Sequence, residues 1–291
     1  MEYGKVYLVP TPIGNLKDIT LRALEVLENV DEIAAEDTRQ SLKLLNHFNI
    51  KKPLFSYHQH NEQGKSDEIL SKLESGKNIA IVTDAGTPGI SDPGSVIVKK
   101  CIENNISFEV LPGATAITTA LVYSGLDTTK FIFRGFIPRE TKERKILTEE
   151  IKDKKETLIF YESPHRLIES LDYLKKSLGN RNIAVCRELT KLHEDIYRGT
   201  IEEAYNWFLE NKPRGEFVLV ISGKTESEIK AEKEQELSGI SVEQQLINLI
   251  NSGIDKKEAI RRLRYEKPNM QVCFRTEEAL KQLYFKGSVE I

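Results

Sequence analysis

The chain has 291 residues, of which 39% are hydrophobic and 30% are charged, and its formal net charge is −3. This length suits two α/β lobes, and no run reaches the roughly 18 apolar residues that a membrane span needs. The near balance of charge excludes a protein that binds polyanions through its overall charge, so contacts with nucleic acid must come from local basic patches. Three cysteines, Cys101, Cys186 and Cys273, lack metal spacing, and without a secretory signal they predict buried free thiols in a cytoplasmic protein.

The first part of the chain alternates short apolar runs with runs of helical periodicity. We expect strands at 5–10, 31–37, 52–57, 78–84 and 107–112, and helices at 20–30, 38–48, 67–75 and 94–105. This alternation predicts βαβ units in a mainly parallel sheet. The strands are apolar on both faces, as a sheet covered by helices on both sides requires.

The same texture continues more loosely after a boundary near residues 114–125. Expected strands there are 130–138, 156–163, 182–189, 195–200 and 216–223, and expected helices are 141–153, 164–179 and 201–210. Residues 224–239 are charged and nearly free of apolar side chains, which indicates a solvated linker. The tail contains two capping-box pairs, Ser241 with Gln244 and Asp255 with Glu258, which predict two helix starts.

Four loops follow predicted strands, at residues 9–20, 35–41, 82–94 and 111–116. In an open α/β sheet, ligands bind beyond the carboxyl ends of the strands, and all four loops belong to that edge. Glycine lets the backbone approach a ligand closely and proline stiffens a loop, although both also occur in ordinary turns. Four such loops at one edge predict a small-molecule site.

The common signatures of phosphate, nicotinamide, metal and hydrolase chemistry are missing from the sequence. There is no GxxxxGK[ST] motif, no GxGxxG after the first strand, no GxSxG elbow, and no cluster with metal-ligand spacing. We therefore expect no metal site.

Eight segments resemble one known family in the same order along the chain. They are "LVPTPIGNLKDITLRAL", "AEDTRQSLKLL", "VTDAGTPGISDPG", "LPGATAITTALVYSGL", "FIFRGFIPR", "FYESPHRL", "RELTKLHEDIYRG" and "GEFVLVISG". The chain is similar, from about residue 5 to about residue 223, to the ribosomal RNA small subunit methyltransferase I family. These enzymes are S-adenosylmethionine-dependent 2′-O-ribose methyltransferases that share a fold class with the tetrapyrrole methylases and diphthine synthase. After Arg264 the sequence departs from the usual family ending.

The resemblance implies a fold of two α/β lobes of the tetrapyrrole methylase type, with a cofactor cleft between the lobes and a small helical appendix. The implied ranges are an N-terminal lobe at 1–114, a second lobe at 115–223, a charged linker at 224–240 and the appendix at 241–291. The implied activity is methylation of a cytidine ribose in 16S ribosomal RNA, within an assembled small subunit, by a homodimer.

The resemblance also implies which residues hold S-adenosylmethionine. The family's cofactor loop corresponds to residues 84–89, a second wall to residues 112–115, and further contacts come from both lobes. The implied set is Pro10, Thr11, Asp84, Gly86, Pro88, Gly89, Pro112, Gly113, Ala114, Thr115, Tyr161, Glu216 and Phe217.

Methyl transfer to a ribose hydroxyl requires removal of the hydroxyl proton, so a base near the cofactor loops is expected. Candidates are Glu36, Asp37, Asp84 and His58. Two of them also fit roles outside catalysis: Asp37 can be the N-cap of the helix that follows it, and His58 can be an RNA contact or a surface residue. In "ESPHR", Ser163 as a cap and Pro164 at the first helical position account for the turn but not for His165 or Arg166.

Basic residues for RNA phosphates gather after the strand at 130–138, where glutamates of the same segment also fit a solvated helix face. The candidates are Arg134, Arg139, Lys142, Arg144 and Lys145, with Arg39, Arg166, Arg187, Lys191 and Arg198 elsewhere. Two rival functions remain open, a methylase of a small tetrapyrrole and a non-enzymatic RNA-binding module on the same fold. The segments "AEDTRQS" and "SYHQHNE" resemble the ribosomal branch, and cofactor binding would exclude the pure RNA binder.

Overall fold

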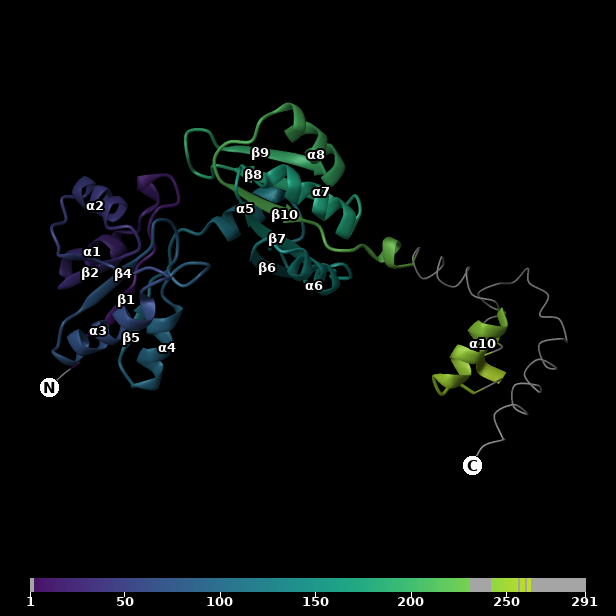
Figure 1. Ribbon diagram of the computed structural model, residues 1–291, viewed down its shortest axis with the longest axis horizontal. Helices are drawn as coiled ribbons and strands as arrows, with labels where there is room; N and C mark the ends of the chain where they lie inside the picture. Colours follow the sequence, from purple (N-terminus) through teal and green to yellow (C-terminus); the bar gives the residue numbers. More distant parts are fainter. Residues whose placement is uncertain (1–2, 231–241, 256, 260, 263–291) are drawn as a thin grey trace. The chain divides into compact units, whose positions relative to one another are not determined.

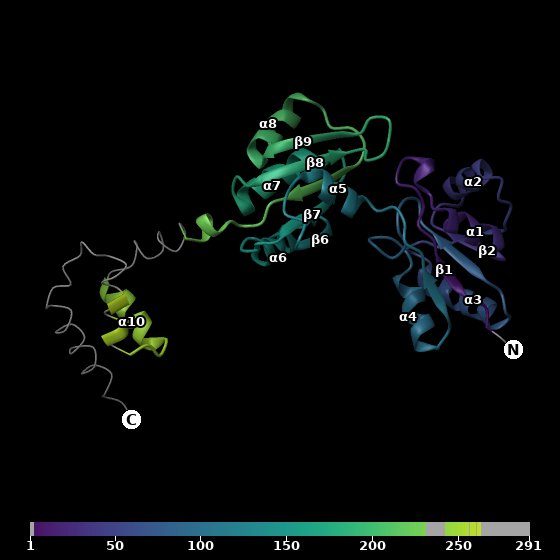
Figure 2. The same ribbon diagram turned by 180° about the vertical axis from the view of Figure 1, so that it is seen from behind.

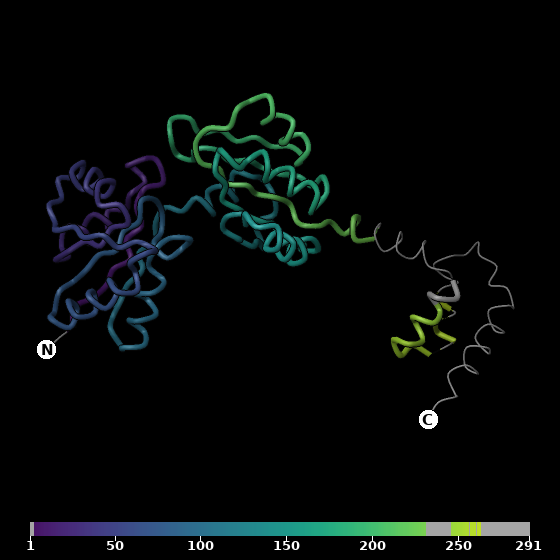
Figure 3. Tube along the Cα trace, in the orientation of Figure 1, coloured from purple at the N-terminus to yellow at the C-terminus, as the bar shows by residue number. Residues whose placement is uncertain are grey.

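The computed structural model describes residues 3–230, 242–255, 257–259, 261 and 262 (Figure 1). The chain divides into two compact units, Met1–Lys224 and Thr225–Ile291. The first unit contains two five-stranded sheets, and Figure 3 shows that the chain passes from the first sheet to the second once.

The first sheet is entirely parallel, with strand order β3-β2-β4-β1-β5. Its strands are β1 (Val6–Leu8), β2 (Glu32–Ala35), β3 (Leu54–Ser56), β4 (Ile79–Val82) and β5 (Phe108–Val110). The helices of this lobe are η1 (Leu16–Asp18), α1 (Leu21–Asn29), α2 (Thr38–His47), α3 (Glu62–Glu74) and α4 (Ser95–Glu103). The parallel sheet predicted for this part of the chain is therefore confirmed.

Helices cover both faces of this sheet, and central β4 shows how its sequence produces that arrangement. All four residues of β4 are buried. Ile79 and Ile81 pack in the core formed with α3 and α4, whereas Ala80 and Val82 pack in the core formed with α1 and α2. Because side chains alternate across a strand, a strand that is covered on both faces must be apolar throughout.

The second sheet has the order β6-β7-β10-β8-β9. Its strands are β6 (Phe131–Phe136), β7 (Thr157–Glu162), β8 (Asn182–Arg187), β9 (Asp195–Thr200) and β10 (Phe217–Ile221). The helices α6 (Thr141–Ile151), α7 (Leu167–Leu178) and α8 (Ile201–Glu210) share one core face, and α5 (Ala116–Ser124) packs on the other (Figures 1 and 2).

The second sheet is mixed, because β6 and β7 are the parallel pair and the other three pairings are antiparallel. β10 is the last of the described strands and inserts between β7 and β8, antiparallel to both. β9 follows β8 without an intervening helix and turns back along it. The order of strands and helices along the sequence does not show that β10 inserts between β7 and β8, or that β9 runs antiparallel to β8.

The chain changes sheets just after β5, since Leu111 belongs to the core of the first sheet and Ile117 to that of the second. Residues 226–230, expected in the solvated linker, are helical instead. Thr225 Oγ1 accepts from the Glu228 amide, and Glu228 Oε2 accepts from the Thr225 amide, so a capping box starts this helix. The limits predicted for the four domains remain predictions.

The second unit contains α10 (Val242–Asn251), and residues 257–259, 261 and 262 are also helical. Leu246 and Ala259 are buried together in a small core. The Asp255 carboxylate accepts from the Lys257 amide at 3.0 Å, as expected of a helix start, whereas Ser241 lies outside the described residues. None of the described helices combines the length and the hydrophobicity that crossing a bilayer would need.

Candidate active site

The four loops predicted to share one edge of the first sheet do meet there. Thr11 and Gly86 exchange backbone hydrogen bonds of 2.9 and 3.0 Å, which join the loop after β1 to the loop after β4. Thr87 Oγ1 donates to the Ala114 carbonyl at 3.2 Å and so connects the loop after β5. The Asp37 amide donates to Asp84 Oδ1 at 3.1 Å and connects the loop after β2.

The loops after β1, β4 and β5 form one wall of a cavity of about 470 Å³, and the second sheet forms the other wall. This volume lies within the usual range for small-molecule sites. The first lobe contributes Ile13, Ala85, Gly86, Thr87, Ile90, Ser91, Asp92 and Thr115. The second contributes Ala116, Phe136, Tyr161, Glu162, Ser163, Pro164, Cys186, Glu188, Leu189, Lys191, Glu216, Phe217 and Val218.

A second cavity of about 450 Å³ adjoins the first and shares Ile13, Ala85, Lys191 and Glu216 with it. Thr11, Thr83 and Asp84 line this second space. The predicted cofactor residues therefore divide into three sets by position. Gly86, Thr115, Tyr161, Glu216 and Phe217 line the larger cavity, Thr11, Asp84 and Glu216 line the adjoining one, and Pro10, Pro88, Gly89, Pro112, Gly113 and Ala114 line neither.

The residues that line neither cavity shape the loops that do. A Cβ atom on Gly113 would lie 2.5 Å from the Pro10 Cβ, so only glycine allows these two loops to pack together. The Ala114 carbonyl accepts the Thr87 hydroxyl hydrogen bond described above. Their role in cofactor binding stays a prediction, and the contacts observed for them are between loops.

A tight turn carries Ile90, Ser91 and Asp92 to the wall of the larger cavity. The Gly89 amide donates to the Pro93 carbonyl at 3.0 Å and closes the turn. Ser91 has a φ of +61°, a conformation that is uncommon for residues other than glycine and costs of order 1 kcal/mol. Such strain is common in active sites, where it fixes the position of the residues that follow.

Three carboxylates, those of the half-buried Glu36 and Asp92 and of the more exposed Asp84, lie close enough to influence one another's ionisation. Burial raises the pKa of Glu36 and of Asp84 above their ordinary values. Burial, followed by the negative charges of Glu36 and Asp84, raises the pKa of Asp92 to about 7. Sequence reasoning missed Asp92, although its position within the Gly/Pro-rich loop was a usable signal.

Asp37 is in the opposite situation. It is the N-cap of α2 and accepts from the Arg39 amide at 2.8 Å, so the capping interpretation is confirmed. Hydrogen bonds from the Arg39 side chain and backbone lower the pKa of Asp37 to about 2. Its side chain lines neither cavity. A carboxylate with so low a pKa is a weak base, and its catalytic role remains a prediction that these contacts do not favour.

Of the other three proposed bases, Asp84 lines the adjoining cavity, whereas Glu36 and His58 line neither cavity. The Glu36 carboxylate accepts from the Asp84 amide at 3.4 Å, so it supports the loop after β4. His58 Nε2 lies 3.2 Å from the Asn61 side-chain nitrogen, and buried His58 Nδ1 has no hydrogen-bond partner in the described part of the chain. Their catalytic roles likewise remain predictions.

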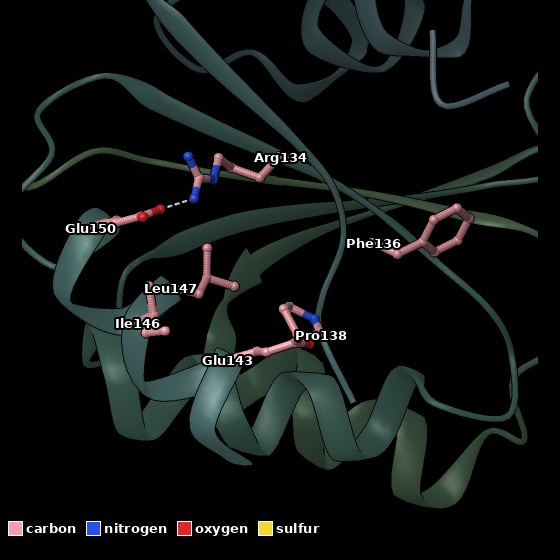
Figure 4. Close-up of a pocket in the computed structure, with 7 residues that line it drawn as sticks. All are labelled: Arg134, Phe136, Pro138, Glu143, Ile146, Leu147 and Glu150. Carbon is pink, nitrogen blue, oxygen red and sulfur yellow. Dashed lines mark hydrogen bonds and ion pairs between the residues drawn. The ribbon is translucent and has the colours of Figure 1, made fainter. Parts of the chain in front are cut away.

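Aromatic rings line the second-lobe side of the larger cavity. Phe133 and Phe136 both pack edge-on against Tyr161, with ring centroids 4.9 and 5.7 Å away. A β-bulge between Phe133 and Phe136 places both rings on the same side of the strand. A smaller hollow of about 260 Å³ lies beside α6. Figure 4 shows the paired Arg134 and Glu150 at one end of it and Phe136 at the other.

Several predicted RNA-binding arginines have internal partners. Arg144 Nε donates to the Pro138 carbonyl at 2.8 Å and pairs with Glu169, and Arg166 donates to the Ile137 carbonyl and lies 3.8 Å from the buried Glu162 carboxylate. Their side chains are each 17% exposed. Arg134 pairs with Glu150, Arg187 with the Arg214 carbonyl, and Arg198 with the Tyr123 carbonyl. These contacts favour structural roles.

The exposed basic candidates are a smaller set. Arg139, Lys142 and Lys145 are exposed and have no hydrogen bond or ion pair to another described residue. The Arg39 side chain is 86% exposed, although it pairs with Asp37, and Lys191 pairs with Glu188 and Glu216. The structure therefore leaves Arg139, Lys142 and Lys145 free to meet a polyanion.

The capping role expected for Ser163 and Pro164 is wrong, because α7 begins at Leu167 with Arg166 as its N-cap residue. The buried Glu162 carboxylate accounts for the difference. It accepts from the Ser163 amide at 2.8 Å and from the Ser170 hydroxyl at 2.5 Å, which holds Ser163 in the turn before the helix.

The cysteines and the expected lack of a metal site can be compared with the structure only over the described residues. Buried Cys101 and Cys186 are free thiols, as predicted, whereas Cys273 lies outside the described residues. Among the described residues, no group of three His, Cys, Asp or Glu side chains could hold a metal ion.

Comparison with known proteins gives the class. A family model described as Tetrapyrrole (Corrin/Porphyrin) Methylases matches residues 5–205. Uroporphyrin-III-C-methyltransferase from Thermus thermophilus has the same fold, with a TM-score of 0.55 and 21% identity over 75% of this chain and 94% of that one. Diphthine synthase matches with a TM-score of 0.57 and 14% identity over 76% of this chain and 91% of its own. The family model and the fold thus define a methyltransferase of the tetrapyrrole methylase class.

Closer relatives identify the family within this class. Proteins named ribosomal RNA small subunit methyltransferase I from Synechocystis sp. and Bacillus subtilis are each 48% identical to this chain. The matches cover 90% of this chain and 93% and 89% of those proteins. The chain belongs to the ribosomal RNA small subunit methyltransferase I family.

Proposed function

We propose that this protein transfers a methyl group from S-adenosylmethionine to the 2′-hydroxyl of a cytidine ribose in 16S ribosomal RNA. The observation that carries the proposal is the 48% identity, over 90% of the chain, to relatives named for small-subunit ribosomal RNA methylation. The cavity between the strand-end loops and the second sheet supplies a site of suitable size. The substrate is the small ribosomal subunit or a precursor of it.

The lining of the larger cavity suits the methyl donor. The donor combines an adenosine, a sulfonium cation and an amino-acid end. The rings of Phe136, Tyr161 and Phe217 offer apolar faces for a planar base and electron-rich faces for a cation. The hydroxyls of Thr87 and Thr115 and the backbone of exposed Ala85 provide polar partners.

The chain's own groups then have two tasks, positioning and proton removal. Methyl transfer is an in-line displacement, so holding the two reactants in register accounts for much of the rate. The second lobe closes the cavity from the other side and excludes water with Leu189, Phe217 and Val218. The exposed cations Arg139, Lys142 and Lys145 lie just before and within the first turns of α6, where they can contact phosphates flanking the target.

The test is methyl incorporation from labelled S-adenosylmethionine into small subunits isolated from cells that lack this protein. Digestion to nucleosides should place the label on the ribose of a cytidine. Subunits from wild-type cells, which already carry the modification, are the matched control and should accept little label. Label on a base, or transfer only to a tetrapyrrole, would contradict the proposal.

A further inference from the structure

Asp92 is held against the larger cavity by a rigid turn. Besides the closing hydrogen bond between Gly89 and Pro93, Gly94 lies so close that a Cβ atom on it would be 3.0 Å from the Gly89 nitrogen. The Gln59 side chain reaches the carbonyl of strained Ser91 at 3.5 Å. The position of the Asp92 carboxylate is therefore set by the loop and not by a partner of the carboxylate.

The carboxylate of Asp92 has no such partner. It makes no hydrogen bond and no ion pair with any residue that the structure describes. Several ionisable groups lie around it on the surrounding elements. Tyr161 and Glu162 on β7, Glu188 and Lys191 after β8, and Glu216 before β10 line the same cavity. Glu36 after β2 and Asp84 after β4 do not line this cavity, but their charges act on Asp92.

Each of the other carboxylates in this set already has a hydrogen-bond or ion-pair partner. Glu36 accepts from the Asp84 amide, and Asp84 accepts from the Asp37 amide. Glu162 accepts from Ser163 and Ser170. Glu188 and Glu216 share the Lys191 ammonium group, which is thereby neutralised as a partner for Asp92. Asp92 is thus the carboxylate of this described set that is free to accept a proton from a substrate.

We propose that Asp92 is the catalytic base that removes the proton from the acceptor hydroxyl, an inference that rests on the proposed function. The hydroxyl oxygen forms a bond to the methyl carbon while the carbon–sulfur bond breaks. The electron pair of that bond stays on sulfur and converts the sulfonium to a neutral thioether. The hydroxyl proton passes to the Asp92 carboxylate and later to solvent.

The ionisation of Asp92 suits this task. A base is most effective when its pKa is near the working pH, because it is then ionised often enough and still binds a proton well. Burial and the nearby negative charges raise the pKa of Asp92 to about 7, whereas Arg39 lowers that of Asp37 to about 2. The strained turn and the unpaired carboxylate are the combination expected where a site stores strain for function.

The experiment compares wild-type protein with Asp92→Asn and Asp92→Glu, and uses Asp172→Asn on the surface of α7 as the matched control. Calorimetry measures donor affinity, and single-turnover methylation of small subunits measures the rate between pH 5.5 and 9. The carboxyl ¹³C resonances of aspartate-labelled protein, without donor or RNA, report the titration of Asp92 directly.

We expect Asp92→Asn to keep the donor dissociation constant within about threefold and to lower the single-turnover rate by about 10²-fold or more. The wild-type rate should rise with pH up to about 7, and Asp92→Asn should lose this dependence. A ¹³C resonance that titrates near pH 7 should vanish in Asp92→Asn and persist in Asp172→Asn. Asp92→Glu should recover part of the rate.

Three results would overturn the proposal. They are a full rate in Asp92→Asn, a loss of donor affinity that accounts for the whole decrease, and an ordinary acidic titration of Asp92. If wild-type protein labels a ribose and Asp92→Asn does so equally fast, Asp92 is not the base and the proposed function stands. If wild-type protein labels something other than a ribose hydroxyl, both proposals fall.

Discussion

Asp37 and Asp92 lie in loops that follow neighbouring strands of one sheet, yet their surroundings give them different chemistry. Asp37 caps a helix and binds Arg39, so its charged form is stabilised. Asp92 is partly buried near two other carboxylates and has no cationic partner among the described residues, so its charged form is destabilised. The pKa of each aspartate is therefore set by its desolvation and its hydrogen-bond and charge partners more than by its residue type.

The raised pKa of Asp92 predicts a pH-dependent stability. Because the folded state binds this proton more tightly than the unfolded chain does, the stabilisation is present at low pH and is lost as the pH rises from about 4 to about 7. Between pH 5 and 8 the wild-type protein should therefore lose about 1–2 kcal/mol more free energy of unfolding than Asp92→Asn, after allowance for solvent screening. Urea unfolding at the two pH values measures the difference, and equal losses in both proteins would contradict it.

Arg166 and Arg139 were both predicted to bind RNA, but their surroundings predict different effects of substitution. Replacing Arg166 with Met removes the guanidinium group that pairs with buried Glu162 and donates to the Ile137 carbonyl. The variant should lose about 2–3 kcal/mol of unfolding free energy, because both partners are left without that group. Arg139→Met, at an exposed position, should leave stability unchanged and weaken binding to small subunits. Unfolding and filter-binding measurements distinguish the two, and a stable Arg166→Met would show that the pairing with Glu162 contributes little.

At the scale of single elements, the bulge in β6 shapes the cavity. Phe133 pairs with Ile159 and Phe136 pairs with Tyr161. Between these two pairs β6 therefore has one more residue than β7. In a regular strand, residues three apart lie on opposite faces, so without the bulge the two phenylalanines would point to opposite sides of the sheet. Gly135, with a φ of +65°, is the residue that allows the bulge.

The bulge predicts a specific effect of Gly135→Ala. A Cβ atom there has space, since its nearest neighbour is Ser91 Oγ at 3.6 Å, but the left-handed backbone should cost about 1 kcal/mol. Relief of this strain shifts Phe136 away from Tyr161, so donor affinity should fall about tenfold or more. Gly125→Ala is the matched control, because Gly125 has a similar φ of +70°, open space around it and a position outside the cavity. Equal donor affinity in both variants would show that the bulge does not contribute to donor binding.

At the scale of the molecule, the cavity depends on contacts between the loops of two separate sheets. A Cβ atom on Gly14, in the loop after β1, would lie 2.4 Å from Lys191 Cγ in the segment after β8. Lys191 in turn joins Glu188 to Glu216 beside β10. The first unit therefore holds every described residue of the candidate site, and Thr225–Ile291 forms a unit of its own.

This division predicts that deleting residues 232–291 leaves the methyl-donor site intact. The truncated protein should bind S-adenosylmethionine with an affinity within about twofold of the full chain and keep its melting temperature. Methylation of small subunits should decrease if the appendix assists in binding the particle. Calorimetry and single-turnover methylation test the two parts separately, and a truncated protein that does not fold would place the appendix within the core.

The sequence by itself determined the location of the strands and of most described helices, because periodicity along a chain records which side chains must be buried. It did not predict α5, which lies where only a boundary was expected. It also determined that four loops would meet at one edge, since parallel strands end on the same side. Only the tertiary structure decided that β10 runs antiparallel between β7 and β8, and that Arg144 and Arg166 serve the loop at Pro138. It also decided that Asp92, and not Asp37, is the desolvated carboxylate at the cavity. These properties depend on groups far apart in the chain, and burial and pairing between such groups leave no local pattern.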